Sequence, residues 1–95
     1  MNNREFKNRI INNIRTLYSM GYHVIGKTVP MSQYALTSSI INAFENSVPR
    51  PVGINYIFEN TETETHYMVE IADNGYIAMR EPTAKELEDY WKKWE

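Results

Sequence analysis

The 95-residue chain contains 10 Lys and Arg against 12 Asp and Glu, and it has no Cys. This length predicts a single compact domain over residues 1–95 with a modest core. The lack of Cys excludes a disulfide framework, a thiolate metal site and a cysteine nucleophile, and it favours a reducing, cytoplasmic location. No apolar run approaches the roughly 20 residues of a membrane span, and residues 1–6 lack the apolar stretch of a signal peptide, so we expect no membrane association.

The first half of the chain predicts a helix, a strand and a second helix. Apolar residues recur at spacings of three and four over residues 3–19, and Gly21 suits the left-handed turn that ends a helix. Residues 22–29 are rich in β-branched and aromatic side chains, which favours a strand. In residues 32–46 an apolar stripe, broadened by Tyr34 and Ile41, follows Ser32 as a candidate N-cap. The polar run at 37–39 has low helix propensity, so two short helices are an alternative there.

The second half predicts an antiparallel meander followed by a helix. Alternating apolar residues over 52–59 and 65–72 indicate two strands joined by a polar hairpin loop at 60–64. The Asp-Asn-Gly run at 73–75 is a strong turn signal before a third strand at 76–80. Thr83 and Glu86 have capping-box spacing, and the apolar residues after them recur at helical spacing. The predicted fold class is therefore α+β, an antiparallel three- to four-stranded sheet with helices packed on one face, in the order α-β-α-β-β-β-α.

Charge is divided unevenly between the two halves of the chain. Residues 1–50 contain six Lys and Arg against two acidic residues, whereas residues 51–95 contain four against ten. Such a molecule presents potentials of both signs that can steer partners, although the same charges also keep each half soluble. Each sign of charge therefore gives one candidate interaction surface.

The acidic candidate surface is the predicted hairpin together with the C-terminal helix. Neighbouring like charges oppose folding slightly, and a basic partner relieves that repulsion and associates faster. Tyr and Trp are common anchors of interfaces, and two Trp lie in the predicted last helix. The candidate partner-binding residues are Glu59, Glu62, Glu64, Glu70, Asp73, Glu88, Trp91 and Trp94. A solvated acidic face that protects the sheet against aggregation is the simpler alternative.

The sequence offers little for catalysis or metal binding. It has no G-x-S-x-G, Walker, H-E-x-x-H or dinucleotide-binding motif, and its four Gly are scattered. His23 and His66 fall on different predicted strands, so we expect neither to be catalytic. Carboxylates on one face of a strand lie about 7 Å apart, which makes a stripe and not the convergent cage that Ca²⁺ or Mg²⁺ requires. We therefore expect no enzyme activity, no metal site and no cofactor.

The basic candidate surface is the exposed side of the first predicted helix. Its candidate nucleic-acid-binding residues are Arg4, Asn8, Arg9, Asn12 and Arg15. Side chains of these types contact phosphates and base edges. Residues 31–94 run α-β-β-β-α, and in this order the chain resembles the double-stranded RNA-binding domain. That family carries a Lys-rich cluster at the start of its last helix, whereas residues 83–88 here read TAKELE, so no functional residues carry over.

Small size and an acidic surface together resemble phage-encoded inhibitors such as anti-CRISPR proteins, and the abundance of Asn, Ile, Lys and Tyr is typical of a low-GC bacterium or its phage. We therefore predict a non-enzymatic protein-binding module. Its acidic hairpin and C-terminal helix would cover a basic surface of a nucleic-acid-handling protein. One alternative is a small nucleic-acid-binding or regulatory protein that uses the first helix. Another is an accessory subunit or a homodimer joined through sheet edges and aromatic residues.

Overall fold

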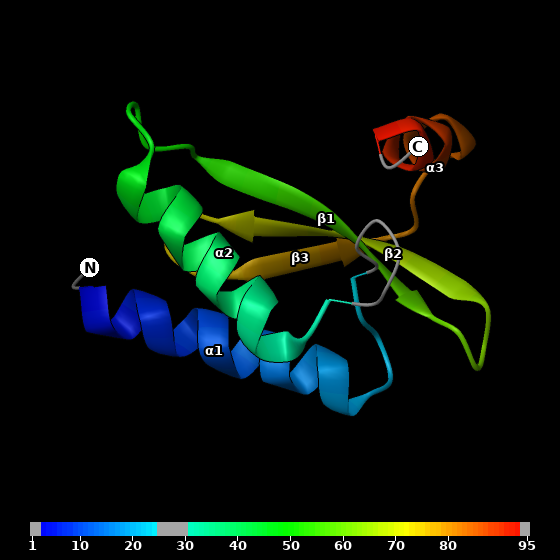
Figure 1. Ribbon diagram of the computed structural model, residues 1–95, viewed down its shortest axis with the longest axis horizontal. Helices are drawn as coiled ribbons and strands as arrows, with labels where there is room; N and C mark the ends of the chain where they lie inside the picture. The colour runs from blue at the N-terminus through cyan, green and yellow to red at the C-terminus, as the bar shows by residue number, and fades with distance from the viewer. Residues whose placement is uncertain (1–2, 25–30, 94–95) are drawn as a thin grey trace.

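The elements of the fold follow the chain in a simple order. The computed structural model describes residues 3–24 and 31–93. It contains α1 (Asn3–Ser19), α2 (Gln33–Asn46), β1 (Gly53–Asn60), β2 (Thr65–Ala72), β3 (Ile77–Arg80) and α3 (Ala84–Lys93) (Figure 1). The α+β class is confirmed, and the meander and the final helix lie where the sequence pattern placed them.

The local signals at the helix ends are also confirmed. The Ser32 hydroxyl accepts a hydrogen bond from the Ala35 N–H at 3.1 Å and caps α2. Gly21 follows α1 with a φ of +92°, the left-handed conformation that suits Gly. α2 runs without a break through its polar centre, where the Thr37 hydroxyl donates to the Gln33 carbonyl at 2.8 Å. One continuous helix therefore replaces the alternative of two short ones.

The three strands form an antiparallel sheet in the order β1-β2-β3. The register pairs Ile54 with Ile71 and Ile71 with Ile77, so the apolar side chains of all three strands share one face. α1 and α2 cover this face, and the ring of Phe6 meets that of Phe44 edge to face at a centroid distance of 5.4 Å. The buried core between them consists of Phe6, Ile10, Ile14, Leu17, Val24, Leu36, Ile40, Phe44, Phe58, Val69 and Ile71.

The strand predicted over residues 22–29 is wrong as far as the structure describes it. His23 makes one isolated antiparallel bridge with Glu59, and residues 25–30 lie outside the described residues. The backbone of Val24 is bonded instead to the Tyr18 hydroxyl and to the N–H of Met31, which ties the segment to the end of α1. The order of the described elements is therefore α-α-β-β-β-α, and the sheet has three strands there.

The position of α3 differs from the prediction that the helices pack on one face. Ile57 and Met68 are register partners on the sheet face that α1 and α2 leave uncovered, and Ile57 is only 3% exposed. Tyr90 of α3 lines a hollow together with both residues, and the Trp91 ring packs against His66 of the same face. In Figure 1, α3 stands apart from α1 and α2. The centre of the hairpin is apolar on both faces, so it needs a helix on each side.

One buried polar residue fixes the β1–β2 hairpin to the end of α1. The Asn60 side chain is 7% exposed, and its Nδ2 donates to the carbonyl of Met20 at 3.3 Å. Its Oδ1 accepts from the backbone N–H groups of Glu62 and Thr63 at 3.0 and 3.3 Å. Asn60 thus shapes the hairpin loop and anchors it, and so sets the position of the carboxylates that the loop carries.

Candidate functional site

The hairpin end, which we define as residues 59–66, carries two exposed carboxylates in its loop. Glu62 and Glu64 are both exposed, and Glu64 has a φ of +56°, a conformation uncommon for residues other than Gly. The hydroxyls of Thr63 and Thr65 share a hydrogen bond of 2.7 Å across the loop. No ion pair joins either carboxylate to a residue that the structure describes.

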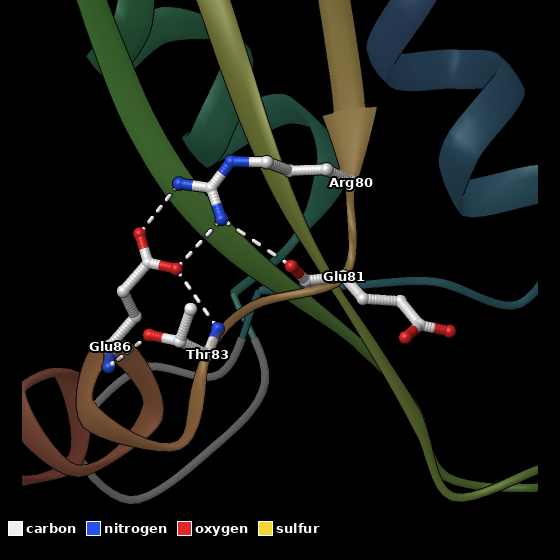
Figure 2. Close-up of polar contacts among 4 residues, drawn as sticks. All are labelled: Arg80, Glu81, Thr83 and Glu86. Atoms are coloured by element: carbon white, nitrogen blue, oxygen red, sulfur yellow. Dashed lines mark hydrogen bonds and ion pairs between the residues drawn. The ribbon is translucent and has the colours of Figure 1, made fainter.

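α3 is tied to the sheet by a polar cluster at its first turn. The Arg80 guanidinium donates to both carboxylate oxygens of Glu86 at 2.7 and 2.6 Å (Figure 2). The same carboxylate accepts from the Thr83 N–H at 2.9 Å, and the Thr83 hydroxyl accepts from the Glu86 N–H at 3.2 Å. The capping box predicted from the sequence is therefore confirmed, and Arg80 adds a strand-to-helix ion pair that the spacing did not reveal.

This cluster removes Glu86 from the negative surface. The hydrogen bonds from Arg80, followed by that from the Thr83 N–H, lower the pKa of the Glu86 carboxyl from 4.5 to about 2. Hydrogen bonds to the ionised form favour it, so the carboxylate stays charged and paired at neutral pH. Glu86 consequently holds α3 in place, and because Arg80 compensates its charge it contributes little to binding a basic partner.

A third carboxylate, that of Glu81, lines a hollow of about 260 Å³ beside Thr65 and His66 of the hairpin end. The hollow is lined by Thr65, His66, Tyr67, Glu81, Pro82 and Leu87. Glu81 is exposed, and no ion pair joins its carboxylate to a described residue. The sequence alone could not assign Glu81 to this position, because the β2–β3 register, which pairs Arg80 with Met68, brings Glu81 to the start of β2. We call Glu62, Glu64 and Glu81 the acidic end.

Trp91 lies beside the acidic end and remains 39% exposed. Its ring meets that of His66 at a centroid distance of 6.3 Å and that of Tyr90 at 5.4 Å, both edge to face. An aromatic side chain that is packed on one side and open on the other is a typical interface anchor. Trp94, the second predicted anchor, lies outside the described residues.

Glu59 lies between two histidines in one row across the sheet. It bridges His23 on one side and is the register partner of His66 on the other, with its Oε1 3.9 Å from the His66 Nε2. Buried atoms of all three side chains have no hydrogen-bond partner in the part of the chain that the structure describes. No three His, Asp or Glu side chains among the described residues are placed to hold a metal ion. Glu59 is largely covered, so it contributes less to the surface than the loop carboxylates.

The other predicted acidic residues do not join the acidic end. Asp73 lies beyond the far end of β2, about 26 Å along the strand from the hairpin loop at 3.3 Å per residue. Glu70 shares a hollow with Arg80 in the middle of the outer sheet face. Glu88 forms an ion pair with Lys92 along α3 at 3.3 Å. The structure thus brings together Glu59, Glu62, Glu64 and Trp91 and separates Glu70 and Asp73 from them, whereas Glu88 lies one helical turn before Trp91 but is paired with Lys92.

Four of the five residues of the alternative basic surface are exposed on α1. Arg4, Asn8, Asn12 and Arg15 are all exposed, at the spacings that place them along one face of the helix. Arg9 is different, because it donates to the Asn74 carbonyl at 3.1 Å and stacks on the Tyr76 ring at 4.3 Å. Arg9 therefore helps to hold α1 against the β2–β3 turn.

A groove between α1 and α2 adjoins this basic face, and no pattern in the sequence indicated it. It encloses about 440 Å³ and is lined by Ile11, Arg15, Gln33, Tyr34, Thr37, Ser38 and Ile41. Tyr34 was expected to broaden the buried stripe of the second helix, but it is 82% exposed. The buried side chains of α2 are Leu36, Ile40 and Phe44. Tyr34 lies outside this buried stripe.

Among the described residues no helix has the length and apolar character needed to cross a membrane. Comparisons with models of protein families, with curated proteins and with solved structures find no significant match to this chain.

Proposed function

We propose that this chain is a non-enzymatic protein-binding module that covers a basic, nucleic-acid-binding surface of another protein with its acidic end and α3. The supporting observation is a contrast in charge compensation. Two carboxylates outside the acidic end are compensated by cations of the same chain, since Glu45 faces Lys7 at 3.2 Å and Glu86 faces Arg80. The three carboxylates of the acidic end have no such cation among the described residues.

The residue types at this surface suit a partner rich in Arg and Lys. Guanidinium groups form paired hydrogen bonds with carboxylates, which gives geometric specificity as well as attraction. The exposed face of Trp91 offers a cation a favourable site over its ring, next to those carboxylates. The acidic end therefore supplies charge for steering, and Trp91 supplies an anchor of large area.

Carboxylates on a protein surface can occupy the sites that a partner provides for phosphates. Binding of this kind is competitive with nucleic acid and weakens as salt screens the exposed charges. A module that acts in this way would inhibit a nucleic-acid-handling protein. The absence of Cys supports a cytoplasmic location for this activity.

The test is affinity capture from nuclease-treated extracts of the native host with wild-type protein and matched variants. Charge reversal in the Glu62→Lys, Glu64→Lys double variant should abolish retention of the partner, and Trp91→Ala should weaken it. The matched control is Arg4→Glu with Arg15→Glu, which reverses two exposed charges on α1 and should leave retention unchanged.

Two results together support the proposal. The wild type should retain a nucleic-acid-binding protein, and the Glu62→Lys, Glu64→Lys variant should lose it while the α1 control keeps it. Retention that survives charge reversal at Glu62 and Glu64 would refute the role of the acidic end. Circular dichroism of each variant checks that the fold is intact, which is expected because both loop side chains are exposed.

A second candidate function is direct nucleic-acid binding through α1, favoured by the exposed row of Arg4, Asn8, Asn12 and Arg15. Phosphate contacts of this kind produce a steep dependence of affinity on salt. A mobility-shift assay at low salt with DNA and RNA tests it directly. Binding that Arg4→Ala with Arg15→Ala weakens would support this function, and the absence of any shift would reject it.

A further inference from the structure

β3 forms an open edge of the sheet. It pairs with β2 on one side through the register from Met68–Arg80 to Ile71–Ile77. No described residue pairs with its other side, whereas the outer edge of β1 receives His23 at Glu59. An open edge presents backbone N–H and C=O groups that a further strand can pair with.

The ladder determines which groups of β3 point outward. The Ala72 N–H donates to the Tyr76 carbonyl at 2.8 Å, so Tyr76 belongs to the set of residues that bond toward β2. Bonding alternates along an antiparallel pair, and Ala78 therefore also bonds toward β2. Ile77 and Met79 direct their N–H and C=O groups away from the sheet, which gives the free edge two donors and two acceptors.

β3 is a short edge strand, and its first three residues carry no charge, Pro or bulge. Apart from shortness, natural edges are blunted by Lys, Pro or a bulge, whereas the run Ile77-Ala78-Met79 is uncharged and regular in its pairing. Met79 is 41% exposed and Tyr76, just before the strand, is 57% exposed. Arg80 is the one charged residue of β3, and it is engaged by Glu86 of the same chain.

We propose that two copies of this chain associate through their β3 edges, antiparallel and about a two-fold axis beside Ala78, to form a continuous six-stranded sheet. In this register Ala78 faces Ala78 of the second copy, and Ile77 faces Met79 of the second copy. In the two Ile77–Met79 pairs, the four outward N–H and C=O groups of each copy then all form hydrogen bonds with the other copy. The two small Ala side chains permit the close approach of a non-hydrogen-bonded pair.

A second copy fits this edge better than a foreign strand does. The outward groups are distributed symmetrically about Ala78, which is the condition for a contact in which both copies use the same patch. The two Arg80 side chains fall at opposite ends of the contact, so no like charges face each other. The hollow beside β3 holds about 150 Å³, room for one side chain and not for the row of pockets that gives a foreign strand its specificity.

The test is sedimentation equilibrium of the full chain at concentrations up to about 1 mM, where even a small interface associates. The wild type should reach twice the 11.2 kDa mass of the monomer as concentration rises. Met79→Pro removes an outward N–H without removing a bond to β2, and Met79→Lys adds an edge charge. Both variants should stay at the monomer mass, with the circular dichroism of the wild type.

Val52→Lys is the matched control, because it replaces an 84% exposed apolar side chain away from β3. It should dimerise as the wild type does. The amides of Ile77 and Met79 should also become protected from hydrogen exchange as the protein concentration rises. A wild type that remains monomeric at about 1 mM, a dimer that persists in both Met79 variants, or a dimer lost in Val52→Lys would overturn the proposal.

Discussion

Arg80, the last residue of β3, holds both carboxylate oxygens of Glu86 in the first turn of α3, at 2.7 and 2.6 Å. The pair bridges a connection of only three residues, and it orients the helix over the outer face of the sheet. This contact helps to hold Trp91 beside the hairpin end, together with the packing of Tyr90 and Trp91 on the outer sheet face.

Removing the guanidinium should therefore loosen α3 while the sheet stays folded. Arg80→Met, made in a Trp94→Phe background so that Trp91 alone reports, should shift the Trp91 emission to longer wavelength as the ring becomes more exposed to water. The control is Glu81→Gln in the same background, because Arg80 contacts the Glu81 backbone carbonyl and not its carboxylate. An unchanged emission in Arg80→Met would contradict the role of the ion pair.

Acid should loosen the same helix. The pKa of the Glu86 carboxyl is lowered from 4.5 to about 2 in the folded protein. A lowered folded-state pKa means that the pair stabilises the fold fully above about pH 4.5, and that this stabilisation is lost as the pH falls toward 2. A titration of Trp91 emission from pH 6 to pH 2 should show this transition in the Trp94→Phe protein. Arg80→Met in the same background should lack it, and identical acid titrations of the two proteins would refute the assignment.

The turn between β2 and β3 requires a Gly at position 75. Gly75 has a φ of +89°, and an added Cβ would lie 2.9 Å from the Cβ of Arg9. We expect Gly75→Ala to reduce the free energy of unfolding by about 1–3 kcal/mol. Gly53→Ala is the control, because the nearest atoms to its Cβ lie at 3.5 Å or more, and its effect should stay below about 0.5 kcal/mol. Urea unfolding of both variants measures the difference.

Asn60 should be a stability determinant of the hairpin. Asn60→Ala leaves the Met20 carbonyl and the N–H groups of Glu62 and Thr63 without their partner, at an expected cost of about 1–3 kcal/mol. The exposed Asn55 in the same strand is the control, and Asn55→Ala should cost less than about 0.5 kcal/mol. Equal midpoints of urea unfolding for the two variants would show that the Asn60 bonds contribute nothing.

Local patterns predicted most of the elements, because their causes lie within a few residues. The Ser32 cap, the Gly21 turn and the Thr83–Glu86 capping box each depend on neighbours in the chain, and all three are present. The alternation of apolar residues in the hairpin likewise predicted which face α1 and α2 cover.

The predictions are wrong where contacts between distant parts of the chain determine the structure. The segment after Gly21 has strand-like residues, but its bonds to Tyr18 and Met31 leave one bridge to β1. The apolar pair Ile57–Met68 on the second sheet face was the available signal for the position of α3. The acidic end could be predicted only in part, because a loop places Glu62 and Glu64 whereas the register between β2 and β3 places Glu81.

The central claim is that the acidic end takes the place of nucleic-acid phosphates on a partner. Its most direct test is to add increasing amounts of the partner's nucleic acid to the purified complex and to measure the fraction of this chain that stays bound. The proposed function predicts complete, saturable displacement, at lower nucleic-acid concentrations for Trp91→Ala than for the wild type. A stable ternary complex of chain, partner and nucleic acid would contradict it.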